Sequence, residues 1–223
     1  MSFSRGLKEK AIKVWEDGYN HPFVQELGQG TLDKKKFQFY LLQDYQYLLQ
    51  YAKVFALATV KADSEELMIQ LTNVQHRALE EINLHKQYME KFGISREEMT
   101  AAQPSLFNRT YTANMLAVGQ TGDLAGILAT VFPCAWTYND YSRRLKAQYA
   151  NRLEDNFYKT WIETYARPEF EESFAWFFDT LDKLVAGKTD AQRARVEQIF
   201  ISSVEFEYLF WDMAYKQEMS YQL

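Results

Sequence analysis

Apolar residues recur at spacings of three and four along most of the chain, a pattern that is typical of helices with one buried face. No stretch alternates between apolar and polar residues in the way that a half-buried strand would. Glycines, prolines and capping residues divide the pattern into separate helices. The expected helices cover residues 3–17, 22–28, 31–61, 64–93, 106–118, 123–150, 155–166, 168–186 and 190–217, with a short one after Ser95. The sequence therefore predicts an all-α bundle of long helices with shorter ones between them.

Capping residues set several of the expected boundaries. Thr31 is expected to cap the long helix that follows it, and Ser64 the next, because hydroxyl oxygens accept hydrogen bonds from the first free N–H groups of a helix. Ser95 and Glu98 are three residues apart and form the pattern of a capping box. Gly93 suits a helix end, because glycine tolerates the left-handed backbone that closes many helices.

Length and composition favour one packed body. The chain has 223 residues, only 9 glycines and 4 prolines, and no low-complexity linker, so residues 1–223 are expected to form a single domain. Aromatic residues make up 16% of the chain, which is more ring surface than one helical core usually needs. This excess indicates an aromatic-lined pocket, an extensive subunit interface, or both.

Charge and cysteine content exclude several classes of protein. The net charge is -5 and both signs are interspersed, so nucleic acid is not expected as a partner. A single cysteine excludes an internal disulfide and fits a reducing compartment. The first residues lack the apolar core of a signal peptide, and no apolar run reaches the ~18 residues of a membrane span. A soluble, cytoplasmic protein without a membrane partner is expected.

An acid stands in the middle of the apolar face of the helix expected at residues 31–61. The apolar residues of that face are Phe37, Tyr40, Leu41, Tyr47, Leu48, Tyr51, Val54, Phe55 and Ala58. Asp44 continues their spacing and must lose its water, which is costly without a hydrogen-bonding partner. It is either a structural acid bonded to a tyrosine or tryptophan of another helix, or a ligand-binding group.

Two glutamates of the last helix are expected to face in different directions. Glu207 shares the spacing of Phe200, Val204 and Trp211 and is therefore predicted to point inward. Glu205, two residues earlier, falls on a mixed polar face and is expected to be a solvated charge. Glu207 could be either a satisfied core acid or a functional one.

The only cysteine, Cys134, lies in the sequence TVFPCAWTYNDY, among aromatic residues. A lone cysteine is most often an inert, buried hydrophobe. Pro133 is expected to kink the helix, because proline removes a backbone donor and crowds the preceding turn. With Asp44 and Glu207, the thiol describes an apolar pocket with a few convergent polar groups, which suits a flat, nitrogen-rich aromatic ring.

The three histidines carry a weaker signal. Glu81 and His85 are four residues apart, which resembles half of a di-iron site in a helix bundle. No later helix supplies a second histidine, so a structural or surface role is expected for His85, and no metal site is predicted.

Six sequence blocks resemble the TenA family, also called thiaminase II, in the order of that family. They are HPFVQELGQGTL, FYLLQDYQYL, TYTANM, FPCAWTY, KTWIETYA and SSVEFEYLFWDMAY, and together they span the chain. The resemblance implies a haem-oxygenase-like helical fold without haem or another cofactor, assembled as a homotetramer. It also implies hydrolysis of aminopyrimidines in thiamin salvage, yielding 4-amino-5-hydroxymethyl-2-methylpyrimidine, and cleavage of thiamin itself.

The same resemblance implies roles for individual residues. Cys134 matches the nucleophile and Glu207 the catalytic acid, while Asp44 matches the acid that binds the pyrimidine. The remaining matches are expected to line the substrate: Tyr47, Tyr111, Tyr138, Tyr165 and Phe210. On this interpretation the thiolate adds to the pyrimidine ring, the ring expels the leaving group, and water then replaces the thiolate.

Two other functions remain open on the sequence. One is a regulatory protein that binds a pyrimidine or thiamin without turnover, and the other is a haem or di-iron helical protein. A regulatory protein would have no need for Cys134 together with Asp44 and Glu207. The scattered histidines disfavour a haem or di-iron protein.

Overall fold

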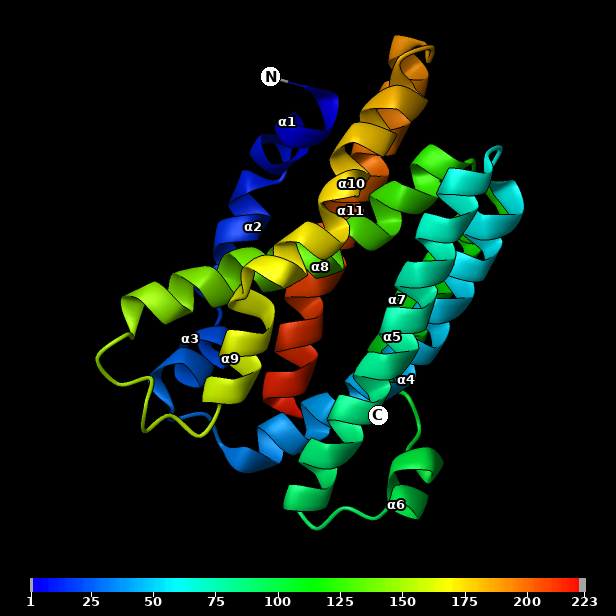
Figure 1. Ribbon diagram of the computed structural model, residues 1–223. Coiled ribbons are helices and arrows are strands. Elements are labelled where there is room, and N and C mark those ends of the chain that lie inside the picture. The colour runs from blue at the N-terminus through cyan, green and yellow to red at the C-terminus, as the bar shows by residue number, and fades with distance from the viewer. Residues whose placement is uncertain (1, 221–223) are drawn as a thin grey trace. The chain divides into compact units, whose positions relative to one another are not determined.

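The computed structural model describes residues 2–220, and the elements in that range are all helices (Figure 1). They are α1 (Phe3–Lys10), α2 (Ile12–Tyr19), α3 (Pro22–Gln29), α4 (Lys34–Lys61), α5 (Glu65–Lys91), α6 (Arg96–Ala101), α7 (Leu106–Thr121), α8 (Leu124–Gln148), α9 (Lys159–Ala166), α10 (Pro168–Val185) and α11 (Asp190–Lys216). The predicted all-α class is confirmed.

The chain divides into two compact units. Unit 1 combines the residues up to Leu32 with Leu128–Asp212, and unit 2 combines Asp33–Ile127 with the chain from Met213 onward. Helices α8 and α11 lie mainly in unit 1.

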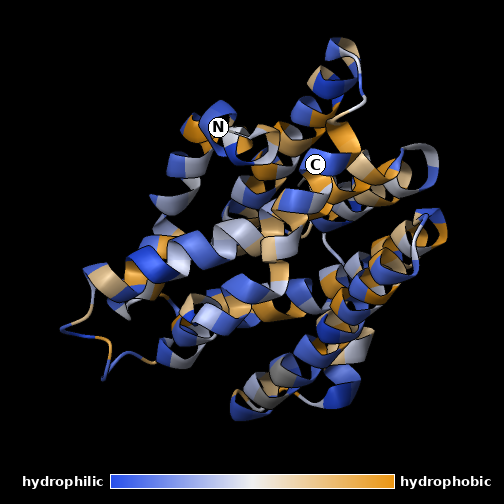
Figure 2. Cartoon of the chain, turned by 45° about the horizontal axis from the view of Figure 1, so that its top comes forward, coloured by the Kyte–Doolittle hydropathy of each residue, from blue (hydrophilic) through white to orange (hydrophobic). Residues whose placement is uncertain are grey.

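Unit 2 is organised around the long helix α4, which packs along α5 and α7 (Figure 1). Its buried face contains Phe37, Tyr40, Leu41, Val54 and Phe55, all fully shielded from solvent. This is the apolar face that the spacing of three and four predicts. Figure 2 shows apolar and polar residues mixed along individual helices in the same way.

Unit 1 has an aromatic core centred on Phe132 of α8. The Phe132 ring stacks on Trp136 with 5.0 Å between centroids, and meets Phe177 and Phe178 of α10 edge-on at 5.2 and 4.8 Å. Trp136 in turn contacts Trp15 of α2, edge to face, at 5.1 Å. Edge-to-face and offset contacts of this kind add stability beyond the burial of area. Much of the unusual aromatic content is therefore used inside this unit.

The expected cap of α4 is wrong by two residues. Asp33, not Thr31, caps the helix, and its carboxylate accepts a hydrogen bond from Lys35 N at 2.8 Å. Thr31 is held in the end of α3 instead, where its backbone N–H donates to the Glu26 carbonyl at 2.9 Å. Gly30 permits this ending because it adopts a left-handed backbone conformation with φ of 78°.

The first expected helix, residues 3–17, is also divided. Helices α1 and α2 meet at Ala11, whose N–H donates to the carbonyls of both Leu7 and Lys8 at 3.1 Å. A donor shared between the third and fourth preceding carbonyls tightens the last turn toward a 3₁₀ geometry. The hydrogen bonding therefore continues while the helix is interrupted.

Three of the predicted capping features are confirmed. Ser64 accepts from Leu67 N at 3.3 Å, and Ser95 and Glu98 form a complete capping box with distances of 2.8 and 3.1 Å. Gly93 has a positive φ of 73° just after the end of α5.

The helix expected at residues 155–166 begins later, at Lys159. Asn156 fixes the preceding loop, because its side-chain amide donates to the carbonyls of Leu27 at 3.0 Å and Gly28 at 2.9 Å. The side-chain oxygen of Asn156, Oδ1, accepts a hydrogen bond from Tyr158 N at 2.8 Å. A side chain that bonds to the backbone in this way competes with helix formation.

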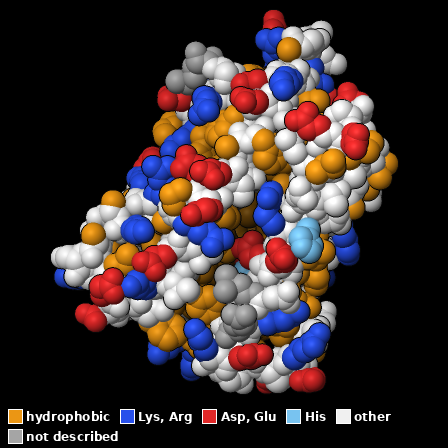
Figure 3. Space-filling model, viewed as in Figure 1, with side chains coloured by type: hydrophobic (Ala, Val, Ile, Leu, Met, Phe, Trp, Pro, Cys, Tyr) orange, Lys and Arg blue, Asp and Glu red, His pale blue; other side chains and the backbone are white. Residues whose placement is uncertain are grey.

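The surface carries both signs of charge, and acidic and basic side chains are interspersed on the face seen in Figure 3. Among residues 2–220, no helix combines the length and the apolar character that crossing a membrane requires.

Candidate active site

Two of the contacts between helices α8 and α11 of unit 1 bracket the predicted site residues. In the first, the hydroxyl oxygens of Thr130 and Ser203 are 3.0 Å apart. In the second, the rings of Tyr138 and Trp211 have centroids 5.0 Å apart. Tyr138 follows Thr130 by eight residues, and Trp211 follows Ser203 by eight. The two contacts therefore come in the same order, at the same spacing, along both helices.

Cys134 and Glu207 lie midway between those two contacts. Cys134 follows Thr130 by four residues, and Glu207 follows Ser203 by four. Four residues are slightly more than one helical turn, so each side chain stays close to the face that makes the contacts. Cys134 on α8 and Glu207 on α11 thus occupy corresponding positions between the two contacts.

The two glutamates of α11 have opposite environments, as predicted. The Glu207 side chain lies in the core with 3% of its surface exposed, whereas Glu205 is exposed to solvent. Helical periodicity therefore identifies Glu207 as the inward-facing carboxyl group of this pair.

Cys134 is half-buried, unlike the fully shielded Phe132 two residues earlier. Helix α8 continues through Pro133. The Thr137 hydroxyl donates to the Pro133 carbonyl at 2.8 Å and approaches the Cys134 carbonyl at 3.3 Å. The thiol is therefore carried by a helix that continues through the proline, and it stays partly accessible, as a reactive cysteine must.

An aromatic cluster continues the same face of α8. The ring of Tyr138 meets Tyr165 of α9 at 5.1 Å, edge to face, and Trp211 of α11 at 5.0 Å. Phe210 is also buried, and its centroid is 6.5 Å from that of Trp211. The structure therefore brings the predicted Tyr138 and Tyr165 together and places Phe210 next to them in the same cluster.

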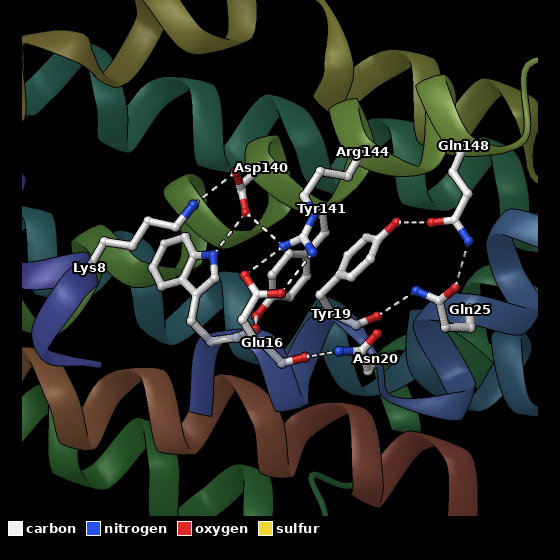
Figure 4. Close-up of polar contacts among 10 residues, drawn as sticks. Lys8, Glu16, Tyr19, Asn20, Gln25, Asp140, Tyr141, Arg144 and Gln148 are labelled. Atoms are coloured by element: carbon white, nitrogen blue, oxygen red, sulfur yellow. Dashed lines mark hydrogen bonds and ion pairs between the residues drawn. The ribbon is translucent and has the colours of Figure 1, made fainter. Parts of the chain in front are cut away.

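Tyr141 links this region to α2 (Figure 4). Its hydroxyl donates to the Trp15 carbonyl at 2.6 Å. Gly18 leaves room for the ring, since a β-carbon there would lie 2.4 Å from the Tyr141 hydroxyl oxygen. Burial raises the pKa of Tyr141 well above its usual value, and the Glu207 carboxylate raises it further. Tyr141 therefore stays protonated, and Glu207 lies within its electrostatic reach.

Asp140 ties the outer face of α8 to α1 and α2 (Figure 4). It accepts from Trp15 Nε1 at 2.8 Å and pairs with Lys8 at 3.0 Å. Arg144, one turn along, holds Glu16 through two hydrogen bonds of 2.9 and 2.7 Å. Bidentate pairs of this kind fix geometry more firmly than single contacts do, so they help to set the position of the helix that carries Cys134.

In unit 2, Asp44 is 4% exposed, and its partner is His85, for which a structural or surface role was expected. His85 Nε2 of α5 lies 2.7 Å from Asp44 Oδ2. The expected bonding to a tyrosine or tryptophan is therefore replaced by a buried ion pair. The position of Asp44 on an apolar face already required a buried donor, but the sequence does not show which helix supplies it.

Tyr47 and Tyr111, the other predicted residues of unit 2, are in contact. Their ring centroids are 5.2 Å apart, and both side chains are buried. Asp44 and Tyr47 are three residues apart on α4 and share one side of that helix. Among the residues described, no group of three histidine, cysteine, aspartate or glutamate side chains is arranged to hold a metal ion.

Comparison with known proteins extends these observations. A model of the TENA/THI-4/PQQC family matches residues 9–217. An aminopyrimidine aminohydrolase from Halalkalibacterium halodurans is 42% identical over 220 residues, which cover 98% of either chain. A TenA homologue from P. horikoshii OT3 is 27% identical with a TM-score of 0.83, over 97% of this chain and 99% of the other.

The fold itself is similar to that of a more distant structure. A domain with a heme oxygenase-like fold from Shewanella denitrificans is 17% identical, with a TM-score of 0.65 over 96% of this chain and 92% of the other. The predicted haem-oxygenase-like fold is thereby confirmed. The match of the family model over most of the chain decides the relationship: the chain belongs to the TENA/THI-4/PQQC family.

Proposed function

We propose that the protein is an aminopyrimidine aminohydrolase of thiamin salvage. Its substrate is 4-amino-5-aminomethyl-2-methylpyrimidine, and its products are the 5-hydroxymethyl pyrimidine and ammonia. Thiamin is cleaved by the same chemistry, with the thiazole as the leaving group. The observation that carries the proposal is the placement of Cys134 and Glu207 at one level of the α8–α11 pair, next to a cluster of tyrosines.

The reaction proceeds in two halves. The Cys134 thiolate adds to the pyrimidine ring and forms a carbon–sulfur bond. The ring electrons then break the bond between the exocyclic methylene and nitrogen, while Glu207 gives its proton to the departing amine. Water adds to the methylene and loses a proton to Glu207, and the carbon–sulfur bond breaks to restore the ring and the thiolate. One difficult displacement thus becomes two easier steps.

The residues of unit 2 recognise the ring. The Asp44 carboxylate accepts a hydrogen bond from the 4-amino group, and Tyr47 and Tyr111 offer aromatic surface to the substrate. The proposal takes residues 1–223 as one functional domain, because a single family model matches residues 9–217 without a break. Cytoplasmic localisation is part of the proposal, since a reactive single thiol is preserved in a reducing compartment.

An ammonia-release assay tests the function directly. Purified protein is given the aminomethylpyrimidine, and ammonia and the hydroxymethyl product are measured together with the haem and metal content. Stoichiometric formation of both products by metal-free protein is expected. Binding without turnover would favour a regulatory protein, and bound haem or iron would favour a haem or di-iron helical protein.

Replacing Asp44 with asparagine is expected to weaken binding of the product pyrimidine by about 10-fold to 100-fold. A hydrogen bond to a buried charged group contributes about 1.5–3 kcal/mol, and the amide replaces one acceptor oxygen with a donor. Calorimetric titration with the product measures the effect. The matched control is Asp33→Asn on the same helix, because Asp33 is exposed and asparagine caps helices equally well. Equal affinity of Asp44→Asn and the control would remove Asp44 from the site.

We also propose that the chain assembles as a homotetramer. Several large apolar side chains of unit 2 are exposed, including Val60 at 83%, Ile69 at 53% and Leu79 at 43%. Exposed apolar surface on a protein commonly meets a partner. Four copies of a 26.3 kDa chain predict a mass of about 105 kDa in light scattering. A monomeric mass at micromolar concentration would contradict the assembly.

A further inference from the structure

His85 and Asp44 form a buried pair between α5 and α4. His85 Nε2 lies 2.7 Å from Asp44 Oδ2, and His85 Nδ1 lies 2.9 Å from the carbonyl oxygen of Glu81. A carbonyl can only accept a hydrogen bond, so Nδ1 carries a proton. A second proton lies between Nε2 and Oδ2, and the surroundings of His85 decide which atom carries it.

The surroundings of His85 favour the protonated ring. Burial alone would lower the pKa of His85, but the carboxylates of Asp44 on α4 and Glu81 on α5 outweigh it and raise the pKa to about 9. The imidazolium is thus the form of His85 at neutral pH, and its Nε2–H donates to Asp44 Oδ2.

The hydrogen bond that Asp44 accepts from His85 affects which ligands Asp44 can bind. A carboxylate offers only acceptors, whereas a carboxylic acid offers one donor and one acceptor. A 4-aminopyrimidine presents an N–H donor at its 4-position. A 4-oxopyrimidine presents an oxygen acceptor there, which a carboxylate repels and a carboxylic acid can bind.

We propose that His85 is a positioning residue that holds Asp44 as a carboxylate, so that the protein selects 4-aminopyrimidines over 4-oxopyrimidines. This inference rests on the proposed function, because it assigns ring recognition to Asp44. His85 acts through Asp44 and takes no part in bond making or breaking.

A purely structural ion pair would have a different signature. Two helices can be held together by well-packed apolar residues at least as well as by a buried ion pair. Loss of a structural pair lowers stability but leaves the relative affinity for two ligands of nearly equal shape unchanged. The ratio of the two affinities is therefore the informative quantity.

The test compares the affinities of the 4-amino product and its 4-oxo analogue by calorimetry between about pH 6 and 8. In His85→Gln the side chain keeps an N–H donor but loses the charge. The preference for the amino ligand should fall about 10-fold to 100-fold, the contribution of a charged hydrogen bond.

Two further variants make the comparison specific. His76 lies on the same helix and pairs with Glu80 at 3.2 Å, but both side chains are exposed. The matched control His76→Gln should therefore keep the wild-type preference. His85→Lys restores a positive charge and should recover part of the preference. A folded His85→Gln protein with the wild-type ratio at every pH would overturn the proposal.

A measurement on the wild type covers the case in which His85→Gln does not fold. Binding of the amino pyrimidine at about pH 7.5 is titrated in buffers of different ionisation enthalpy, and no proton should be released. Release of about one proton would show that Asp44 is protonated in the free protein and would overturn the proposal. None of these titrations needs turnover, so a failure of ammonia release is distinguished from a failure of ligand selection.

Discussion

Cys134→Ser is expected to keep the fold and to lose at least about 10³-fold in kcat. A thiol with an ordinary pKa of ~8.5 supplies a useful fraction of thiolate at neutral pH. The pKa of a hydroxyl group is far higher than that of a thiol, so the serine ionises many orders of magnitude less readily and its addition to the ring is correspondingly rare. Steady-state ammonia release measures kcat, and circular dichroism checks the fold.

The single thiol provides its own control. Cys134 is the only cysteine of the chain, so alkylation by iodoacetamide reports on that site alone. One equivalent of label should abolish turnover, and the product pyrimidine should protect against labelling. Near wild-type kcat in a folded Cys134→Ser protein would exclude the covalent mechanism.

The second large effect is expected in Glu207→Gln, with a decrease in kcat of roughly 10²–10⁴, the usual contribution of a positioned acid–base group. The amide preserves the size of the side chain but cannot transfer a proton to the leaving amine. Glu207 is buried and lies at the level of Cys134 on the neighbouring helix. The variant is compared with the wild type over a range of pH, because loss of the acid should also remove one limb of the pH–rate profile.

Glu205→Gln is the matched control for that experiment. It makes the same chemical change two residues earlier on the same helix, at an exposed position. Its kcat should stay within a few fold of the wild type. A large loss of kcat in Glu205→Gln, together with a near wild-type kcat in Glu207→Gln, would contradict the assignment of Glu207 as the acid.

The local features of this chain were predictable because short-range rules govern them. The different exposure of Glu205 and Glu207 follows from helical periodicity alone. The capping box of Ser95 and Glu98 depends on a spacing of three residues. The start of α4 was misplaced because Asp33 and Thr31 are both good caps, and the ending of α3 decides between them.

The partner of Asp44 was not predictable in the same way. His85 lies 41 residues after Asp44, on the next helix, and reaches it only because α5 folds back along α4. Sequence spacing shows that a buried acid needs a donor but not where the donor comes from. Periodicity likewise predicts the inward faces of α8 and α11, whereas the register that aligns Cys134 with Glu207 comes from contacts between the helices.

The discontinuous make-up of unit 1 affects how the chain emerges from the ribosome. Its first 32 residues are synthesised long before Leu128–Asp212. That later segment supplies Trp136, which contacts Trp15, and Trp211, which contacts Phe23. At 5–20 residues per second, translation of the intervening stretch takes roughly 5–20 s. During that interval the first three helices present apolar surface without their native partners, while α4, α5 and α7 can already pair with one another. The N-terminal segment is therefore the part of unit 1 that waits longest for its native contacts during synthesis.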